Sequence, residues 1–193
     1  DSSTSRGLGD VYKRQFQKGY EDNVPKDSGA DAAKKILEEA GYTKSGDFYQ
    51  KDGKTAGFSI TTFGSDTVTQ AKFQRIEQQL KQAGIKVTND NQPESNFNSV
   101  VGTKSYDCTL SGWAVGAIMA DSPQYFYTKD INNGVGDDEI DKLIAKISAT
   151  ESKDEQIKLA NQVEKLHMEK VAIYLPFANG PSYSAVKSKL ANY

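Results

Sequence analysis

The stretch 58–88 constrains the fold more than any other part of the sequence. Residues 58–63 are strand formers between two glycines, apolar residues recur at three- and four-residue steps over 66–83, and 85–88 alternates apolar with polar residues. A strand, a helix and a strand joined by short links form a βαβ unit, in which the strands run parallel and the helix crosses one face of the sheet. The stretch therefore predicts an α/β fold.

Two elements are expected before this unit. Apolar residues at helical spacing predict a helix over 30–40 that ends at Gly41. Residues 42–54 predict a turn or a short hairpin, because Asp52-Gly53 is a strong signal for a tight turn. The polar segment 16–28 precedes them and is expected to be a connection.

A third strand is expected after the unit. Pro93 breaks the chain, and a short helix is expected over 95–101. Residues 106–110 then alternate apolar and polar side chains, which predicts a strand. Cys108 lies on its apolar side and is expected to be a small buried residue.

The only tryptophan, Trp113, lies just past the carboxyl end of this third strand, and a loop rich in glycine and alanine follows it. Ligand sites in open α/β sheets gather outside the carboxyl ends of strands. A large amphipathic ring beside flexible backbone suits the floor of such a site. The alternative is that Trp113 is an ordinary core or rim aromatic.

The last third of the chain predicts two helices and a strand. Asp137 can cap the first helix, and Ser152-Lys153-Asp154-Glu155 is a capping box for the second, which is expected to run to about Lys170. The apolar run 171–175 predicts a strand buried on both faces, which Pro176 stops. The buried stripe of the first helix is expected to be Ile140, Leu143, Ile144 and Ile147.

The composition excludes several classes of function. A net charge of −2, from 24 basic and 26 acidic residues, provides no basic field for nucleic acid. No run of about 18 apolar residues is present that could span a bilayer. One cysteine, Cys108, and one histidine, His167, exclude an internal disulfide and a cysteine- or histidine-rich metal site. Neither a metal nor a cofactor is therefore expected.

Enzyme chemistry finds little support in the sequence. It contains no phosphate-cradling glycine-rich loop and no nucleophile elbow. His167 lies beside core positions of the last helix and is expected to be packed there. The acidic clusters at 137–139 and 151–155 lie at helix starts, where negative charge favours the helix dipole. The protein is expected not to be an enzyme, and a small α/β enzyme that uses His167 is the less favoured alternative.

Residues 1–15 differ from the rest of the chain, because they have no apolar period and no apolar run typical of a signal peptide. The string 6–15 resembles translated sequencing-adapter sequence fused to a gene fragment. We therefore expect 1–15 to be a non-native or disordered lead, and the natural protein to be truncated at its N-terminus.

Four motifs occur in a fixed order along the chain. They are Ala32-Ala33-Lys34-Lys35-Ile36-Leu37-Glu38-Glu39-Ala40-Gly41-Tyr42, Gln78-Gln79-Leu80-Lys81-Gln82-Ala83-Gly84-Ile85-Lys86-Val87, Tyr106-Asp107 followed by Ser111-Gly112-Trp113, and Asp137-Asp138-Glu139-Ile140-Asp141-Lys142-Leu143-Ile144. Together they resemble the C-terminal lobe of the family-5 solute-binding proteins, the extracytoplasmic oligopeptide- and dipeptide-binding components of ABC importers.

The resemblance implies a receptor with two lobes of the periplasmic-binding-protein-like (type II) fold, which close on a ligand between them. Each lobe is a three-layer α/β structure with a mixed sheet flanked by helices. In this chain, 16–175 would be the C-terminal lobe, and 176–193 would return toward a missing N-terminal lobe. The resemblance also implies a lipoprotein, in the periplasm or on the outer face of the cell membrane, that delivers its solute to ABC permease subunits.

The same resemblance implies where a ligand binds. In peptide-binding members the Gly-Trp strand end faces the cleft, and an aspartate three residues after the tryptophan binds the α-ammonium group of the ligand. Gly116 stands at that position here, and Asp121 is the nearest carboxylate. The expected ligand is an oligopeptide, with a sugar or a nickel chelate as the alternative. The expected ligand-binding residues are Gly112, Trp113, Ala114, Gly116 and Asp121.

Overall fold

A computed structural model of the 193-residue chain describes Gly19 and residues 21–110, 126–132 and 134–175. The chain divides into two compact units. One runs from Lys26 to Ala114, and the other combines the segment up to Pro25 with the segment from Val115 onward. Within the described ranges, no helix is both long enough and apolar enough to cross a membrane.

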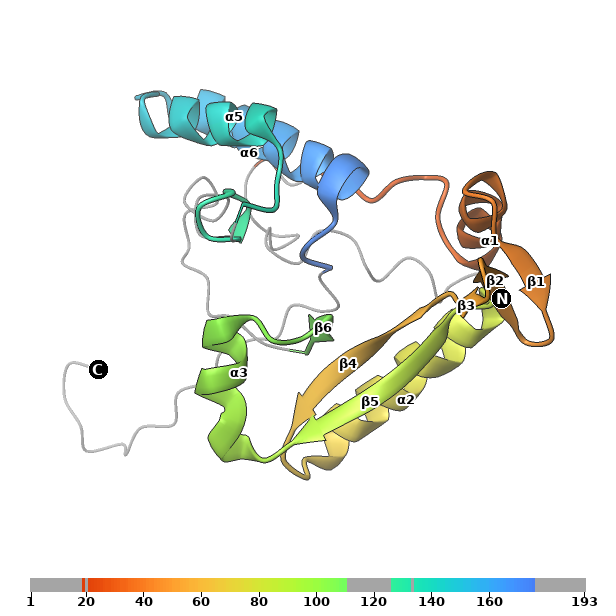
Figure 1. Ribbon diagram of the computed structural model, residues 1–193. Helices are drawn as coiled ribbons and strands as arrows, with labels where there is room; N and C mark the ends of the chain where they lie inside the picture. The colour runs from red at the N-terminus through yellow and green to blue at the C-terminus, as the bar shows by residue number, and fades with distance from the viewer. Residues whose placement is uncertain (1–18, 20, 111–125, 133, 176–193) are drawn as a thin grey trace, which may run out of the picture. The chain divides into compact units, whose positions relative to one another are not determined.

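The first unit is built on the predicted βαβ arrangement, which is confirmed (Figure 1). Strand β4 (Gly57–Phe63) lies between β5 (Lys86–Gln92) and β6 (Cys108–Thr109), and both neighbours run parallel to it. Helix α2 (Thr67–Gln82) follows β4 and packs on one face of this sheet. The core between them contains Ile60, Phe73 and Val87, with Phe58, Ile76, Leu80, Ile85 and Leu110 packed around it.

Helix α2 begins and ends at specific signals. The Asp66 carboxylate caps its start by accepting a hydrogen bond of 2.7 Å from the backbone N–H of Thr69. Its end is a Schellman motif, in which the N–H groups of Gly84 and Ile85 donate to the carbonyls of Lys81 and Leu80. This motif needs a left-handed residue, and Gly84 has φ +77°.

A helix and a small antiparallel sheet precede the βαβ unit, as expected. Helix α1 (Ala30–Glu39) ends at Gly41, and strands β1 (Thr43–Ser45), β2 (Phe48–Lys51) and β3 (Lys54–Thr55) form two consecutive hairpins. The second hairpin turns at Asp52-Gly53, where both residues have positive φ, as a type I′ turn requires.

In this unit the length of β5 and the burial of Cys108 differ from the prediction, whereas the short helix agrees with it. Strand β5 continues to Gln92, whereas the alternation of apolar residues predicted an end at 88. The short helix is confirmed, as α3 (Phe97–Thr103) after the 3₁₀ turn η2 (Glu94–Asn96). Cys108 is exposed, so the expectation that it is buried is wrong; it lies on β6, an edge strand of the described sheet.

The second unit contains a pair of packed helices, α5 (Asp138–Ser148) and α6 (Lys153–Leu166), followed by the π-helical turn η4 (His167–Val171). The predicted caps are confirmed: Asp137 accepts from the N–H of Glu139 and Ser152 from the N–H of Glu155. The predicted stripe is also confirmed. The buried core of this unit is Phe126, Tyr127, Ile140, Ile144, Ile147, Leu159, Ala160 and Val163, with Leu143 packed against it.

The predicted strand over 171–175 is wrong. Val171 closes the π-helical turn, Ala172 is left-handed with φ +49°, and Ile173, Tyr174 and Leu175 belong to no strand. The reason is a side chain that the apolar pattern does not reveal. The His167 imidazole accepts the N–H groups of Ile173 and Tyr174, which a strand would use for its ladder.

Candidate functional site

The five residues predicted to bind ligand lie outside the described residues, so their role stays a prediction. They are Gly112, Trp113, Ala114, Gly116 and Asp121. The structure does describe the strand that leads to them. Because β6 runs parallel to β4 and β5, its carboxyl end points to the edge at which Phe63 and Gln92 end the other two strands. This is the carboxyl edge, as the sequence predicted.

Near this edge, hydroxyl groups of β4 pair with polar side chains of β5 on both faces of the sheet. Thr61 and Thr62 are 0% and 1% exposed. The Thr61 hydroxyl donates to an Asp90 carboxylate oxygen at 3.1 Å, and the Thr62 hydroxyl lies 2.8 Å from Asn89 Oδ1 and 3.0 Å from Asn91 Oδ1. These pairs satisfy the hydrogen-bonding capacity of the buried hydroxyls. They also explain why β5, which has few apolar residues, continues to Gln92.

The loops at the carboxyl edge extend this network. Gln92 donates to Asp90 at 2.7 Å, accepts from the Asn96 amide at 3.3 Å, and its backbone carbonyl accepts the N–H of Gly64 at 2.9 Å. Phe63 and Phe97 meet edge to face with ring centroids 5.0 Å apart, and Phe97 is partly exposed. Ordered amide and carboxylate groups beside an exposed ring can bind a polar solute. The hydroxyl of Thr61, which pairs with the Asp90 carboxylate, is buried and therefore out of reach of a substrate.

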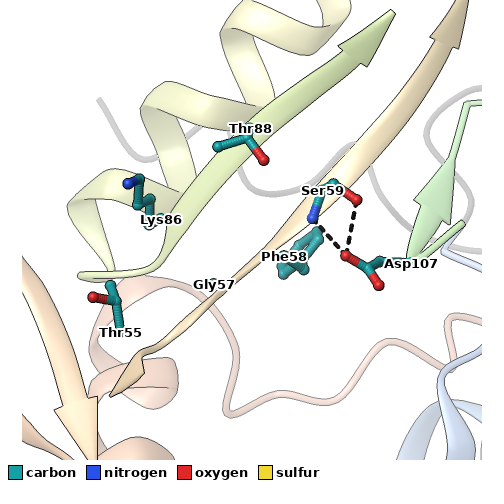
Figure 2. Close-up of a pocket in the computed structure, with 7 residues that line it drawn as sticks. All are labelled: Thr55, Gly57, Phe58, Ser59, Lys86, Thr88 and Asp107. Carbon is teal, nitrogen blue, oxygen red and sulfur yellow. Dashed lines mark hydrogen bonds between the residues drawn. The ribbon is translucent and has the colours of Figure 1, made fainter. Parts of the chain in front are cut away.

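The first unit also carries a pocket of about 330 Å³ that is open to solvent (Figure 2). It lies at the opposite edge of the sheet, where β4 and β5 begin at Gly57 and Lys86. A Cβ on Gly57 would lie 2.3 Å from the Lys86 carbonyl oxygen, so these two strand starts approach too closely for a side chain. The pocket is lined by Thr55, Gly57, Phe58, Ser59, Lys86, Thr88 and Asp107.

A serine and an aspartate lie together in this pocket. The Ser59 hydroxyl donates to Asp107 Oδ2 at 2.8 Å, and the Ser59 backbone N–H donates to the same oxygen at 2.8 Å. The backbone N–H, followed by the hydroxyl, lowers the pKa of the Asp107 carboxyl. A carboxylate held this way is a poor base, so the pair joins two segments of the chain and does not resemble an activated nucleophile.

His167 is buried in the second unit, as expected, and its contacts are structural. It is 1% exposed, stacks on Tyr127 with ring centroids 4.1 Å apart, and accepts through Nε2 from the N–H groups of Ile173 at 3.2 Å and Tyr174 at 3.4 Å. Burial lowers the pKa of His167 to about 4, although the negative charge of Glu164 acts to raise it. At neutral pH the ring is uncharged and out of reach of a substrate.

Neither unit offers a metal site in its described part. No three His, Cys, Asp or Glu side chains gather there in a way that could hold an ion. Sequence reasoning missed the Thr61–Asp90 and Thr62–Asn89 pairs of the carboxyl edge. The signal was present as two threonines at the end of one strand and Asn89-Asp90-Asn91 at the end of its partner.

Comparison with known families gives a match over most of the chain. Residues 8–137 match the model described as "Bacterial extracellular solute-binding proteins, family 5 Middle". The match begins inside the stretch 1–15, which is expected to be a non-native or disordered lead, and that expectation stays a prediction.

Two curated relatives are oligopeptide-binding proteins named OppA. The chain is 31% identical over 187 residues to the one from Mycobacterium tuberculosis (strain ATCC 25618 / H37Rv), and the alignment covers 92% of this chain and 30% of that protein. It is 27% identical over 184 residues to the one from Lactococcus lactis subsp. cremoris (strain SK11), covering 90% and 30%. The chain therefore spans about 30% of the length of the curated relatives it matches.

Solved structures share the fold. The oligopeptide-binding protein AppA from Bacillus subtilis, in complex with a nonapeptide, superposes with a TM-score of 0.68 at 22% identity over 89% of this chain and 37% of that one. A periplasmic oligopeptide-binding protein from Thermotoga maritima, with mannohexaose bound, gives 0.72 at 17% identity over 87% and 35%. These structures confirm the predicted α/β class of periplasmic binding proteins.

Proposed function

The chain belongs to the bacterial extracellular solute-binding proteins of family 5, and from this premise we propose that it is part of the substrate-binding receptor of an ABC importer for oligopeptides. The observation that carries the proposal is the 31% identity to an oligopeptide-binding protein over 92% of the chain. Identity over nearly the whole chain supports an inherited role better than any single motif does.

The ligand site of this receptor is the loop that follows β6. The proposed binding residues are Gly112, Trp113, Ala114, Gly116 and Asp121. Support comes from the direction of β6, which leads the chain to the carboxyl edge of the sheet. With glycine at 116, the α-ammonium group of a peptide lacks the aspartate that the family resemblance implies there, and Asp121 supplies the nearest negative charge.

The remaining parts of the proposal follow from membership in a transport family. The protein binds its solute without chemical conversion, works on the extracytoplasmic side as a lipid-anchored receptor, and passes the solute to ABC permease subunits. Residues 16–175 form a lobe of this receptor, 176–193 return toward a second lobe, and 1–15 are a lead without function. Neither nucleic acid nor a cofactor takes part.

The proposal is tested by solute selectivity, with Trp113 as the reporter because it is the only tryptophan in the chain. The purified chain is titrated with a pool of tri- to nonapeptides of mixed sequence, and separately with mannohexaose and with nickel bis-histidine. We expect peptides to change Trp113 emission and saturate in roughly the millimolar range, while the other solutes leave it unchanged.

Calorimetry on the same samples provides a second measurement, and Trp113→Phe provides the control because it removes the emission signal. The peptide assignment fails when both methods show no response up to about 10 mM peptide. A saturable response to the oligosaccharide or the nickel chelate alone would replace it with the corresponding non-peptide solute.

A further inference from the structure

Helix α6 carries two buried polar side chains that lie one turn apart. Asn161 is 5% exposed and Glu164 is 3% exposed, while Leu159, Ala160 and Val163 of the same helix belong to the core shared with α5. A buried amide or carboxylate needs hydrogen-bond partners, because it has lost its hydration. Two amphipathic helices packed on each other leave their polar faces to water, so the partners of these two groups show what else this unit holds.

Both side chains bind the polar segment that precedes the first unit. The Asn161 amide donates to the Gly19 carbonyl at 2.9 Å, and the Asn23 amide donates to the Glu164 carboxylate at 2.8 Å. The partners are 142 and 141 positions apart in the sequence. Gly19 together with residues 21–25 is called the strap below. The sequence predicts only a polar connection here, and the structure gives that connection two anchor points on α6.

The strap is held by these polar contacts more than by apolar burial. Glu21, Asp22 and Pro25 are exposed, and Val24 is half-buried. The Val24 N–H donates to Asp22 Oδ1 at 3.2 Å, which is a local turn within the strap. Hydrogen bonds contribute modestly to stability, because the released groups bind water instead. A segment with so little apolar area to lose opens at a lower free energy than the helix core beneath it.

We propose that Asn161 and Glu164 form a clasp for the strap, and that the strap is a latch: it releases and docks again as a separate segment while α5 and α6 stay packed. Docked, it satisfies the two polar groups of α6. Released, it leaves them to water. The second unit ends at Pro25 and the first begins at Lys26, so the clasp also fixes where the chain leaves the second unit. This inference goes beyond the proposed function and does not depend on the solute.

Limited digestion of the full chain with trypsin measures release of the strap. Cleavage after Lys26, which is exposed at the end of the strap, requires the strap to leave α6, whereas cleavage after Lys158 inside α6 requires the helix pair to open. Asn23→Asp replaces the donor with a second carboxylate beside Glu164. We expect it to accelerate cleavage after Lys26 about tenfold and cleavage after Lys158 less than about twofold. Mass spectrometry of the first products separates the two cleavages.

Glu164→Gln provides the matching second variant. Alone, it keeps an oxygen that can accept from the Asn23 amide, so cleavage after Lys26 should stay within about threefold of the parent. Combined with Asn23→Asp, its amide can donate to the carboxylate at position 23, which restores the pair with donor and acceptor exchanged. The double variant should therefore return to within about threefold of the parent rate. Asn98→Asp is the matched control, because it makes the same change of charge at an exposed residue of α3 and should alter neither rate.

Three results would overturn the proposal. Cleavage after Lys26 at the parent rate in Asn23→Asp would show that Glu164 does not hold the strap. Equal acceleration after Lys26 and Lys158 would show that the strap and the helix pair open together, so the strap would not be a latch. A double variant cleaved as fast as Asn23→Asp alone would show that the acceleration does not pass through the contact with Glu164.

Discussion

The His167 imidazole is buried, and within the described residues only its Nε2 has a hydrogen-bond partner. Nε2 accepts two backbone N–H groups, so the proton of the neutral ring lies on Nδ1, which finds no acceptor in the described part of the chain. Among the described residues, the ionisable side chains around the ring are Glu164, Tyr127 and Tyr174. Protonation would place a charge in this buried site and remove the acceptor for Ile173 and Tyr174.

We therefore expect acid to destabilise the second unit. The pKa of His167 is about 4 in the folded protein and near 6.5 in the unfolded chain, so the unfolded chain binds the proton more tightly. Stability is complete above pH 6.5 and falls as the pH drops toward 4, by about 3 kcal/mol in total. Urea unfolding followed by circular dichroism at pH 7.5 and 4.5 measures this difference.

His167→Gln is the companion variant, because its side chain cannot titrate. It should be less stable than the parent at pH 7.5, but its stability should change much less between the two pH values. An equal loss in both proteins would assign the acid sensitivity to other groups.

Single residues also show what sequence reasoning could and could not supply. The packing of His167 was predictable, because it lies beside a helical stripe of apolar residues. Its hydrogen bonds to Ile173 and Tyr174 were not, since they depend on a π-helical turn and a left-handed Ala172 that no apolar pattern specifies. The prediction that Cys108 is buried was wrong for a related reason. Alternation shows which face of the sheet a side chain occupies, and not whether that face is covered at that strand.

At the scale of elements, Gly84 joins the end of α2 to the hairpin sheet. Its left-handed φ of +77° completes the Schellman motif, and its carbonyl accepts the N–H of Tyr49 at 2.9 Å. A Cβ at this position would lie 2.6 Å from the Tyr49 ring, which is 3% exposed. A side chain would therefore introduce both backbone strain and a buried clash.

We expect Gly84→Ala to destabilise the first unit by about 2–4 kcal/mol, from the left-handed penalty together with the overpacking at Tyr49. Gly46→Ala is the matched control, because Gly46 is also left-handed at φ +62° and has no atom within 4 Å of an added Cβ. It should lose only about 1 kcal/mol. Chemical denaturation of both variants measures the difference, and equal losses would show that Tyr49 moves aside without cost.

The elements with strong periodic or capping signals were predicted well. Helix α2, the parallel pair of β4 and β5, and the turn at Asp52-Gly53 all follow from local chemistry. The carboxyl half of β5 was missed because its stability comes from pairing with Thr61 and Thr62 across the sheet. Such long-range partners cannot be assigned from one strand's own sequence.

At the scale of the whole molecule, the chain forms two units and spans about 30% of the length of its oligopeptide-binding relatives. The family could be predicted from the sequence, because the four motifs occur in a fixed order and each specifies local structure. The predicted ligand site lies in residues that the structure does not describe, so it stays a prediction. In the proposed receptor, a peptide lies between two lobes. The chain is proposed to supply one of these lobes.

This arrangement predicts how tightly the chain binds by itself. Binding affinity comes from the surplus of contacts over the cost of ordering a ligand, and a flexible peptide loses many rotatable degrees of freedom. With one wall of the cleft, we expect the 193-residue chain to bind peptides at least about 100-fold more weakly than the full-length relative from Mycobacterium tuberculosis does. Calorimetry of both proteins with the same mixed peptide library makes the comparison. Micromolar binding by this chain would show that its own residues form a complete site, and the two-lobed cleft would then be the wrong description of how it holds its ligand.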